Sequence, residues 1–147
     1  MVSILPIGSS DLKYLDGLKI AEFARLNTKS NDIFITPPNF GSFRTVANRA
    51  IIVDLQCFSF RSDRMVEWWD RVNDCYGPIN PTASIIQKSD QLYKNYYTIN
   101  DSKIEYLSNK YNANYAILHS NTQSSFPFIY DDGKYKNRRF RAIARNR

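Results

Sequence analysis

Three short segments hold most of the side chains that could bind a ligand or move a proton. The first runs from Pro37 to Arg44, the second from Asp54 to Phe58, and the third from His119 to Asn121. Together they supply a guanidinium, a carboxylate, an imidazole, amides and aromatic rings, a set that suits an anionic or sugar-like ligand. The candidate ligand-binding residues are Asn39, Phe40, Phe43, Arg44, Asp54, Phe58 and His119.

Each charged candidate also has a purely structural explanation. Asp54 can cap a chain end or pair with Arg44 or Arg49, and the single histidine, His119, can be a satisfied structural side chain. If Arg44 only neutralises Asp54, the ion pair is not available to a ligand and contributes little to the free energy of unfolding. The enzymatic alternative uses Asp54 and His119 as an acid/base pair. The sequence leans away from an enzyme, and we assign no catalytic residue.

Motifs for common cofactors and nucleophiles do not occur in the sequence. One histidine and two separated cysteines, Cys57 and Cys75, make a poor set of zinc ligands. Gly41 stands alone, so there is no glycine-rich phosphate loop, and no G-x-S-x-G or Cys–His arrangement is recognisable. We therefore expect no metal and no cofactor. The cysteines are predicted to be thiols, with a disulfide as the alternative.

The segment from Glu67 to Arg71 attracts attention because it contains two adjacent tryptophans. Glu67 and Arg71 are four residues apart and can pair on a helix. Trp68 is predicted to face inward, together with either Met65 or Trp69. A core tryptophan beside a solvated ion pair is the simpler interpretation, and a stacking platform for a sugar ring is the alternative.

Hydrophobic periodicity predicts the elements that position these segments. Helices are expected at 11–26, 41–48, 62–73, 89–97 and 100–111, strands at 33–36, 50–55 and 115–118, and a hairpin at 126–140. Strands separated by helices imply right-handed crossovers and a parallel sheet. The prediction is an α/β fold, a small three-layer domain with a short, mainly parallel sheet and a C-terminal antiparallel hairpin. Because ligands collect at the carboxyl ends of such strands, the site is placed between the Pro37–Arg44 and Asp54–Phe58 loops.

Length and composition fit one domain. The 147 residues are 43% hydrophobic, enough for a core, and no apolar run is long enough for a membrane helix. We expect an N-terminal extension at 1–10, a single α/β domain at 11–140 and a basic tail at 141–147. Residues 1–10 lack the features of a signal peptide, so the chain is expected to be cytoplasmic if it is complete.

The net charge of +6 comes from the end of the chain. Without the seven basic residues after Gly133, the chain holds 13 basic and 14 acidic residues. This distribution weakens the case for a nucleic-acid-binding fold. The run around Arg138 and Arg139 can be a solvated edge strand, a contact for anionic lipid headgroups or, as the least favoured alternative, a contact for nucleic acid.

Several short motifs resemble a known family. They include the run from Asn31 to Pro38, then Phe43-Arg44, Arg49, Val53-Asp54, and Glu67-Trp68 with Arg71. Over residues 12–140 the chain is similar to the soluble C-terminal domain of unknown function of bacterial multi-spanning membrane proteins, whose membrane part resembles glycosyltransferases. The chain departs from that pattern at Gln56 and Ser59, where a lysine and a proline would be usual.

The resemblance implies an extracytoplasmic location if the chain is part of a longer protein. It implies a membrane-embedded, glycosyltransferase-like partner encoded elsewhere, whose catalytic carboxylates have no counterpart here. The expected function is therefore a non-catalytic accessory or ligand-binding domain, possibly a fragment of a longer protein. The alternative is a free-standing small cytoplasmic enzyme or nucleic-acid-binding protein.

Overall fold

The elements follow the predicted order of helix, strand, helix, strand, several helices, strand and hairpin. The structure is a computed structural model that describes residues 17–38, 40–55, 61–80, 82–131, 133 and 135–139. Its helices are α2 (Leu18–Asn27), α3 (Gly41–Ala47), α4 (Ser62–Tyr76), α5 (Ile85–Tyr97) and α6 (Asp101–Tyr111). Its strands are β1 (Ile33–Ile35), β2 (Ala50–Ile51), β3 (Tyr115–His119), β4 (Phe128–Asp131) and β5 (Tyr135–Arg139).

The described strands form one mixed sheet in the order β2-β1-β3-β5-β4. Strand β1 pairs in parallel with both β2 and β3, whereas β5 runs antiparallel to both β3 and β4. The three predicted parallel strands and the C-terminal hairpin are therefore confirmed. The hairpin joins the sheet on the β3 side, which leaves β2 at the opposite edge.

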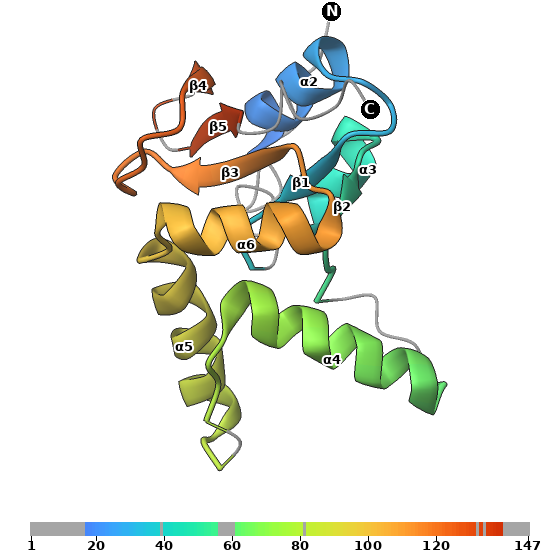
Figure 1. Ribbon diagram of the computed structural model, residues 1–147, viewed down its shortest axis with the longest axis vertical. Helices are drawn as coiled ribbons and strands as arrows, with labels where there is room; N and C mark the ends of the chain where they lie inside the picture. Colours follow the sequence, from blue (N-terminus) through green and yellow to red (C-terminus); the bar gives the residue numbers. More distant parts are fainter. Residues whose placement is uncertain are drawn as a thin grey trace, which may run out of the picture.

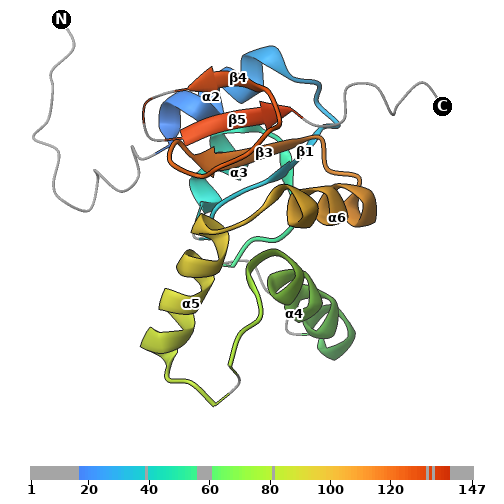
Figure 2. The ribbon, with the colours of Figure 1, turned by 60° about the vertical axis from the view of Figure 1, so that its left-hand side comes forward.

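Two apolar clusters lie on the two faces of the sheet, because side chains alternate along each strand. Phe34 and Ile117 belong to one cluster with α2 and α3, whereas Ile35 and Leu118 belong to the other with α4, α5 and α6. Figures 1 and 2 show the sheet between these two groups of helices. The predicted three-layer α/β architecture is confirmed.

Helix α4 contacts the core mainly through its C-terminal half. Its buried residues are Val72, Cys75 and Tyr76, while residues 61–67 are exposed. In Figure 1 the N-terminal half of α4 extends past the sheet. The prediction that Met65 or Trp69 faces inward is wrong, since they are 39% and 41% exposed. Both fall on the same side of the helix as Val72 and Tyr76, but they precede the buried part of α4.

Strand β2 is shorter than predicted. The expected strand at 50–55 covers only Ala50 and Ile51, because β1 ends at Ile35 and offers no backbone partner beyond the bond from Ile52 N to Phe34 O. Ala50 is exposed, as befits an edge strand rather than one covered on both faces.

Helix starts differ from the predictions where a capping residue was overlooked. Helix α5 begins at Ile85 instead of residue 89, because Ser84 and Gln87 form a capping box. Helix α2 begins at Leu18 after Gly17, and residues 11–16 lie outside the described residues. Helix α6 follows its predicted cap, with Asn100 accepting a hydrogen bond from Lys103 N.

Arg49 connects the ends of the two helices on the α2–α3 face. Arg49 is 9% exposed, and its guanidinium donates to Thr28 Oγ1 and to the carbonyl oxygens of Arg25, Thr28, Ala47 and Asn48. Because the Arg49 guanidinium satisfies carbonyl groups after α2 and α3 together, it fixes the position of α3 and of the β2 strand that follows.

The basic residues of β5 belong partly to the core of the hairpin. Strand β5 lies between β3 and β4, so it is not the solvated edge strand considered above. Arg138 is 8% exposed and donates to Phe126 O, and its guanidinium carbon lies 5.2 Å from the centre of the Phe128 ring. The predicted tail at 141–147 lies outside the described residues.

Candidate functional site

A cleft lies beside the edge strand β2 and the segment that follows it. It has a volume of about 440 Å³, and we call it the edge-strand cleft. Its floor is the chain from Ala50 to Asp54. The lining also includes Arg44 of α3 and four residues of α4: Arg64, Glu67, Trp68 and Arg71. Of the predicted ligand-binding residues, Arg44 and Asp54 line this cleft.

Two hydrogen bonds hold α4 beside this strand. Trp68 Nε1 donates to Asp54 O at 2.9 Å, and Arg71 Nη1 donates to Ile52 O at 2.9 Å. Both acceptors are backbone carbonyls of the segment that continues β2. Arg71, the later residue of α4, bonds to Ile52, and Trp68, the earlier one, bonds to Asp54. Helix α4 therefore runs antiparallel to this segment. One helical turn before Trp68, Arg64 therefore lies toward the carboxyl end of the segment.

Arg71 serves the fold and has little capacity left for a ligand. Its Nη2 donates to Glu67 Oε1 at 2.7 Å, which confirms the predicted pair at positions i and i+4. Its guanidinium carbon also lies 5.3 Å from the centre of the Tyr111 ring. Glu67 is correspondingly engaged, so its carboxylate is not a free anionic group in the cleft.

Arg44 and Arg64 are less constrained. Arg44 and Arg49 were both predicted as possible partners of Asp54, and the structure places Arg44 near it. Arg44 Nη1 is 3.8 Å from Asp54 Oδ2, beyond hydrogen-bond distance. The Arg44 side chain is 56% exposed, so the ion pair contributes at most about 1 kcal/mol. Arg64 is exposed, and no hydrogen bond or ion pair joins its side chain to another described residue.

The remaining sequence candidates lie elsewhere. Phe43 packs against Phe34 with ring centres 5.0 Å apart, and Phe40 packs against Tyr135 at 5.0 Å, so both are core residues that do not line the cleft. Asn39 and Phe58 lie outside the described residues.

His119 ends β3 at the predicted edge but faces another environment. It is 9% exposed, and its ring stacks on Tyr97 of α5 with centres 3.7 Å apart and an angle of 9°. Strand β1 separates β2 from β3, so Asp54, which follows β2, and His119, at the end of β3, do not come from neighbouring strands. His119 does not line the edge-strand cleft.

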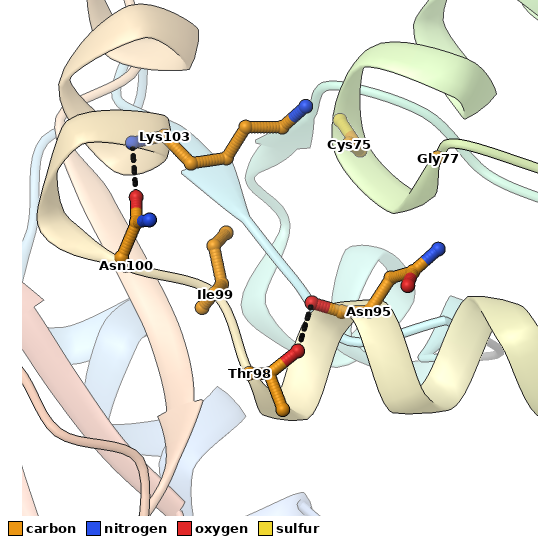
Figure 3. A pocket seen from close by; sticks show the side chains of 7 residues that line it. All are labelled: Cys75, Gly77, Asn95, Thr98, Ile99, Asn100 and Lys103. Carbon is orange, nitrogen blue, oxygen red and sulfur yellow. Dashed lines mark hydrogen bonds between the residues drawn. The ribbon is translucent and has the colours of Figure 1, made fainter.

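A smaller pocket of about 200 Å³ lies where α4 ends and α5 passes into α6. Figure 3 shows its lining, with the Lys103 side chain extended toward the end of α4 that carries Cys75. Burial raises the pKa of the Cys75 thiol to about 12, so the thiol stays protonated at neutral pH and is a poor nucleophile. Cys75 is free, as predicted for a buried thiol, and Cys57 lies outside the described residues.

The polar groups of this smaller pocket are largely used in local structure. Thr98 Oγ1 donates to Asn95 O at 3.5 Å, and the side-chain oxygen of Asn100 accepts from Lys103 N at 2.8 Å. Asn95 Nδ2 donates to the carbonyl oxygens of Tyr76 and Pro78. This pocket therefore offers a ligand less than the edge-strand cleft does.

Comparisons with known proteins describe part of the chain. Residues 16–75 match a family described as a domain of unknown function, DUF6798. The matched stretch runs from before α2 to the end of α4 and includes every residue that lines the edge-strand cleft. No curated protein and no solved structure matches the chain.

Membrane-spanning helices and metal-ligand clusters do not occur among the described residues. No described helix has the length and apolar content to cross a bilayer. No group of three or more histidine, cysteine, aspartate or glutamate side chains among the described residues is arranged to hold a metal ion.

Proposed function

We propose that this chain is a non-catalytic ligand-binding domain whose edge-strand cleft takes an anionic ligand. The observation that carries the proposal is the pair of exposed guanidiniums that line the cleft, Arg44 and Arg64. Arg44 has only a long contact with Asp54, and the Glu67 carboxylate pairs with Arg71. Arginine favours carboxylate and phosphate ligands because its planar fork of N–H donors matches two oxygens at once.

The enzymatic alternative has less support from the geometry. It needs a proton-transferring pair within reach of one substrate. His119 stacks against Tyr97 and lines neither of the cavities described above, and the Cys75 thiol is held protonated by burial. An accessory or binding role requires only the cleft and its two arginines.

The wider setting of the domain follows from the sequence resemblance alone. In that setting the domain lies outside the cytoplasmic membrane beside a glycosyltransferase-like membrane part. The anionic ligand would then include phosphate-bearing molecules such as nucleotide-sugars or polyprenyl phosphates. These molecules form one arm of the test below, and inorganic phosphate and glutarate form the other.

The test is an amide NMR titration of ¹⁵N-labelled protein with these anions. The proposal expects shifts concentrated at residues 44–55 and 64–71. Arg44→Gln is expected to weaken binding, whereas Arg25→Gln, which removes an exposed charge on α2, is the matched control and is expected to leave it unchanged. Shifts that are equally reduced by both variants would indicate only a general effect of net charge. Absence of shifts with every anion would overturn the proposal.

A further inference from the structure

We propose that the ligand of the edge-strand cleft is a free α-amino acid with an acidic side chain. This inference rests on the proposed function and names the class of its ligand. It uses two residues that line the cleft, Arg44 and Asp54, which place a positive and a negative side chain next to each other. An α-amino acid carries the complementary charges, a carboxylate and an ammonium group bonded to the same carbon atom.

The two charged groups are close to each other without being joined. Arg44 Nη1 is 3.8 Å from Asp54 Oδ2, a distance too long for a hydrogen bond. The Arg44 side chain is 56% exposed, and the Asp54 side chain keeps 12% of its surface exposed. A carboxylate can accept about four hydrogen bonds, so the contacts of Asp54 within the fold do not exclude a further donor.

The backbones that carry both groups are fixed by the fold. Trp68 Nε1 donates to the carbonyl oxygen of Asp54 at 2.9 Å, which holds this residue beside α4. Arg44 belongs to α3, and the Arg49 guanidinium donates to the carbonyl groups at the end of that helix. A site whose backbone is already ordered loses less conformational entropy when a ligand binds.

The Asp54 carboxylate distinguishes an amino acid from a simple anion. An anion held by Arg44 lies close to Asp54, which repels it because both are negatively charged. In an α-amino acid the ammonium nitrogen lies about 3 Å from the nearer carboxylate oxygen, a separation similar to the 3.8 Å between Arg44 and Asp54. With its carboxylate on Arg44 and its ammonium on Asp54, the ligand completes a group of four charges that alternate in sign.

The charge of the whole lining favours an acidic amino acid. Three arginines and two carboxylates line the cleft, which leaves one positive charge in excess: Arg44, Arg64, Arg71, Asp54 and Glu67. A neutral zwitterion satisfies Arg44 and Asp54 without balancing this excess, whereas an additional carboxylate on the ligand balances it. The cleft volume of about 440 Å³ accommodates a molecule of this size.

The test compares L-glutamate with glutarate, which lacks only the α-ammonium group, by amide NMR titration of ¹⁵N-labelled protein. Glutarate has the larger negative charge, so attraction to the positive charge of the cleft alone would favour glutarate. The inference expects the reverse. L-Glutamate should bind at least tenfold more tightly, with shifts concentrated at residues 44–55, because only glutamate supplies a donor to the Asp54 carboxylate.

The variant Asp54→Asn separates the two ligands further, because it removes the negative charge at nearly constant shape. It is expected to weaken L-glutamate binding at least tenfold and to leave glutarate binding unchanged or tighter, since the repulsion is gone. Arg44→Gln should weaken both ligands, and the control Arg25→Gln should change neither. A dispersed amide spectrum checks that each variant is folded. If Asp54→Asn does not fold, the comparison of glutamate with glutarate on the wild type decides.

The inference is overturned if glutarate or inorganic phosphate binds the wild-type cleft as tightly as L-glutamate does. It is also overturned if a folded Asp54→Asn variant loses the same factor in affinity for glutamate and for glutarate. In both cases the proposed anion-binding function survives. If neither L-glutamate nor any other anion binds, the inference and the proposed function fail together.

Discussion

Replacing Arg49 with methionine should destabilise the domain strongly. The substitution keeps an unbranched apolar stem but removes five hydrogen bonds to described residues, four of them to backbone carbonyls at the ends of α2 and α3. Each buried carbonyl left without a donor costs about 1–3 kcal/mol. Water can reach some of these oxygens in the variant, and removing a buried cation recovers part of its desolvation penalty.

The expected loss is about 3 kcal/mol in the free energy of unfolding, or about 10 °C in Tm for a chain of this size. Urea unfolding followed by circular dichroism measures it. Arg25→Met is the control, because the Arg25 side chain is exposed and its loss should change stability by less than about 0.5 kcal/mol. If the free energies of unfolding of Arg49→Met and Arg25→Met differ by less than about 1 kcal/mol, the idea that Arg49 holds the ends of α2 and α3 together is refuted.

Three further perturbations follow from single contacts. Hydrogen bonds from Ser125 and Ser124 lower the pKa of Asp101 below 3.8, so its stabilisation is present above pH 3.8 and is lost as the pH falls through the folded-state pKa. Asp101→Asn should therefore lower the free energy of unfolding at pH 6. The difference from the wild type, measured by urea unfolding, should narrow toward pH 2.5, and a difference that stays constant with pH would contradict this. The Cys75 thiol, with a pKa of about 12, should react with iodoacetamide much more slowly in folded than in unfolded protein, and equal rates would contradict its burial. Gly17→Ala should cost more than 2 kcal/mol, because Gly17 has φ +80° and a Cβ there would lie 2.1 Å from the Phe40 ring; a Tm within 2 °C of the wild type would contradict that packing.

Local sequence signals predicted the elements whose position depends little on tertiary contacts. The apolar run at Ile33–Ile35 and the hairpin around Gly133 are specified by short-range patterning and turn chemistry, and both occur where expected. The three-layer order also followed, because strands separated by helices restrict the connections that the chain can make. The placement of the site between two loops depended on this topology, and Arg44 and Asp54 are the residues of those loops that line the edge-strand cleft.

The residues that line the cleft were harder to predict, because they depend on how whole elements dock. The short β2 strand reflects the end of β1 at Ile35, which the sequence around Ala50 does not encode. Arg64 lines the cleft because Trp68 bonds to Asp54 O, a tertiary contact. The His119 ring stacks on Tyr97, which lies in α5 and precedes His119 by 22 residues. Periodicity could place each of these side chains on an element but could not pair the elements.

The most direct test of the central claim is the ratio of anion affinities between the wild type and the Arg44→Gln/Arg64→Gln variant. Inorganic phosphate and glutarate are each titrated at the same low salt concentration. The account predicts that at least one of them binds the wild type, and that the double variant loses at least tenfold in affinity for it, equivalent to about 1.4 kcal/mol, while Arg25→Gln stays within twofold. Equal affinities for the wild type and the double variant would contradict the account, as would a loss of the same size in Arg25→Gln.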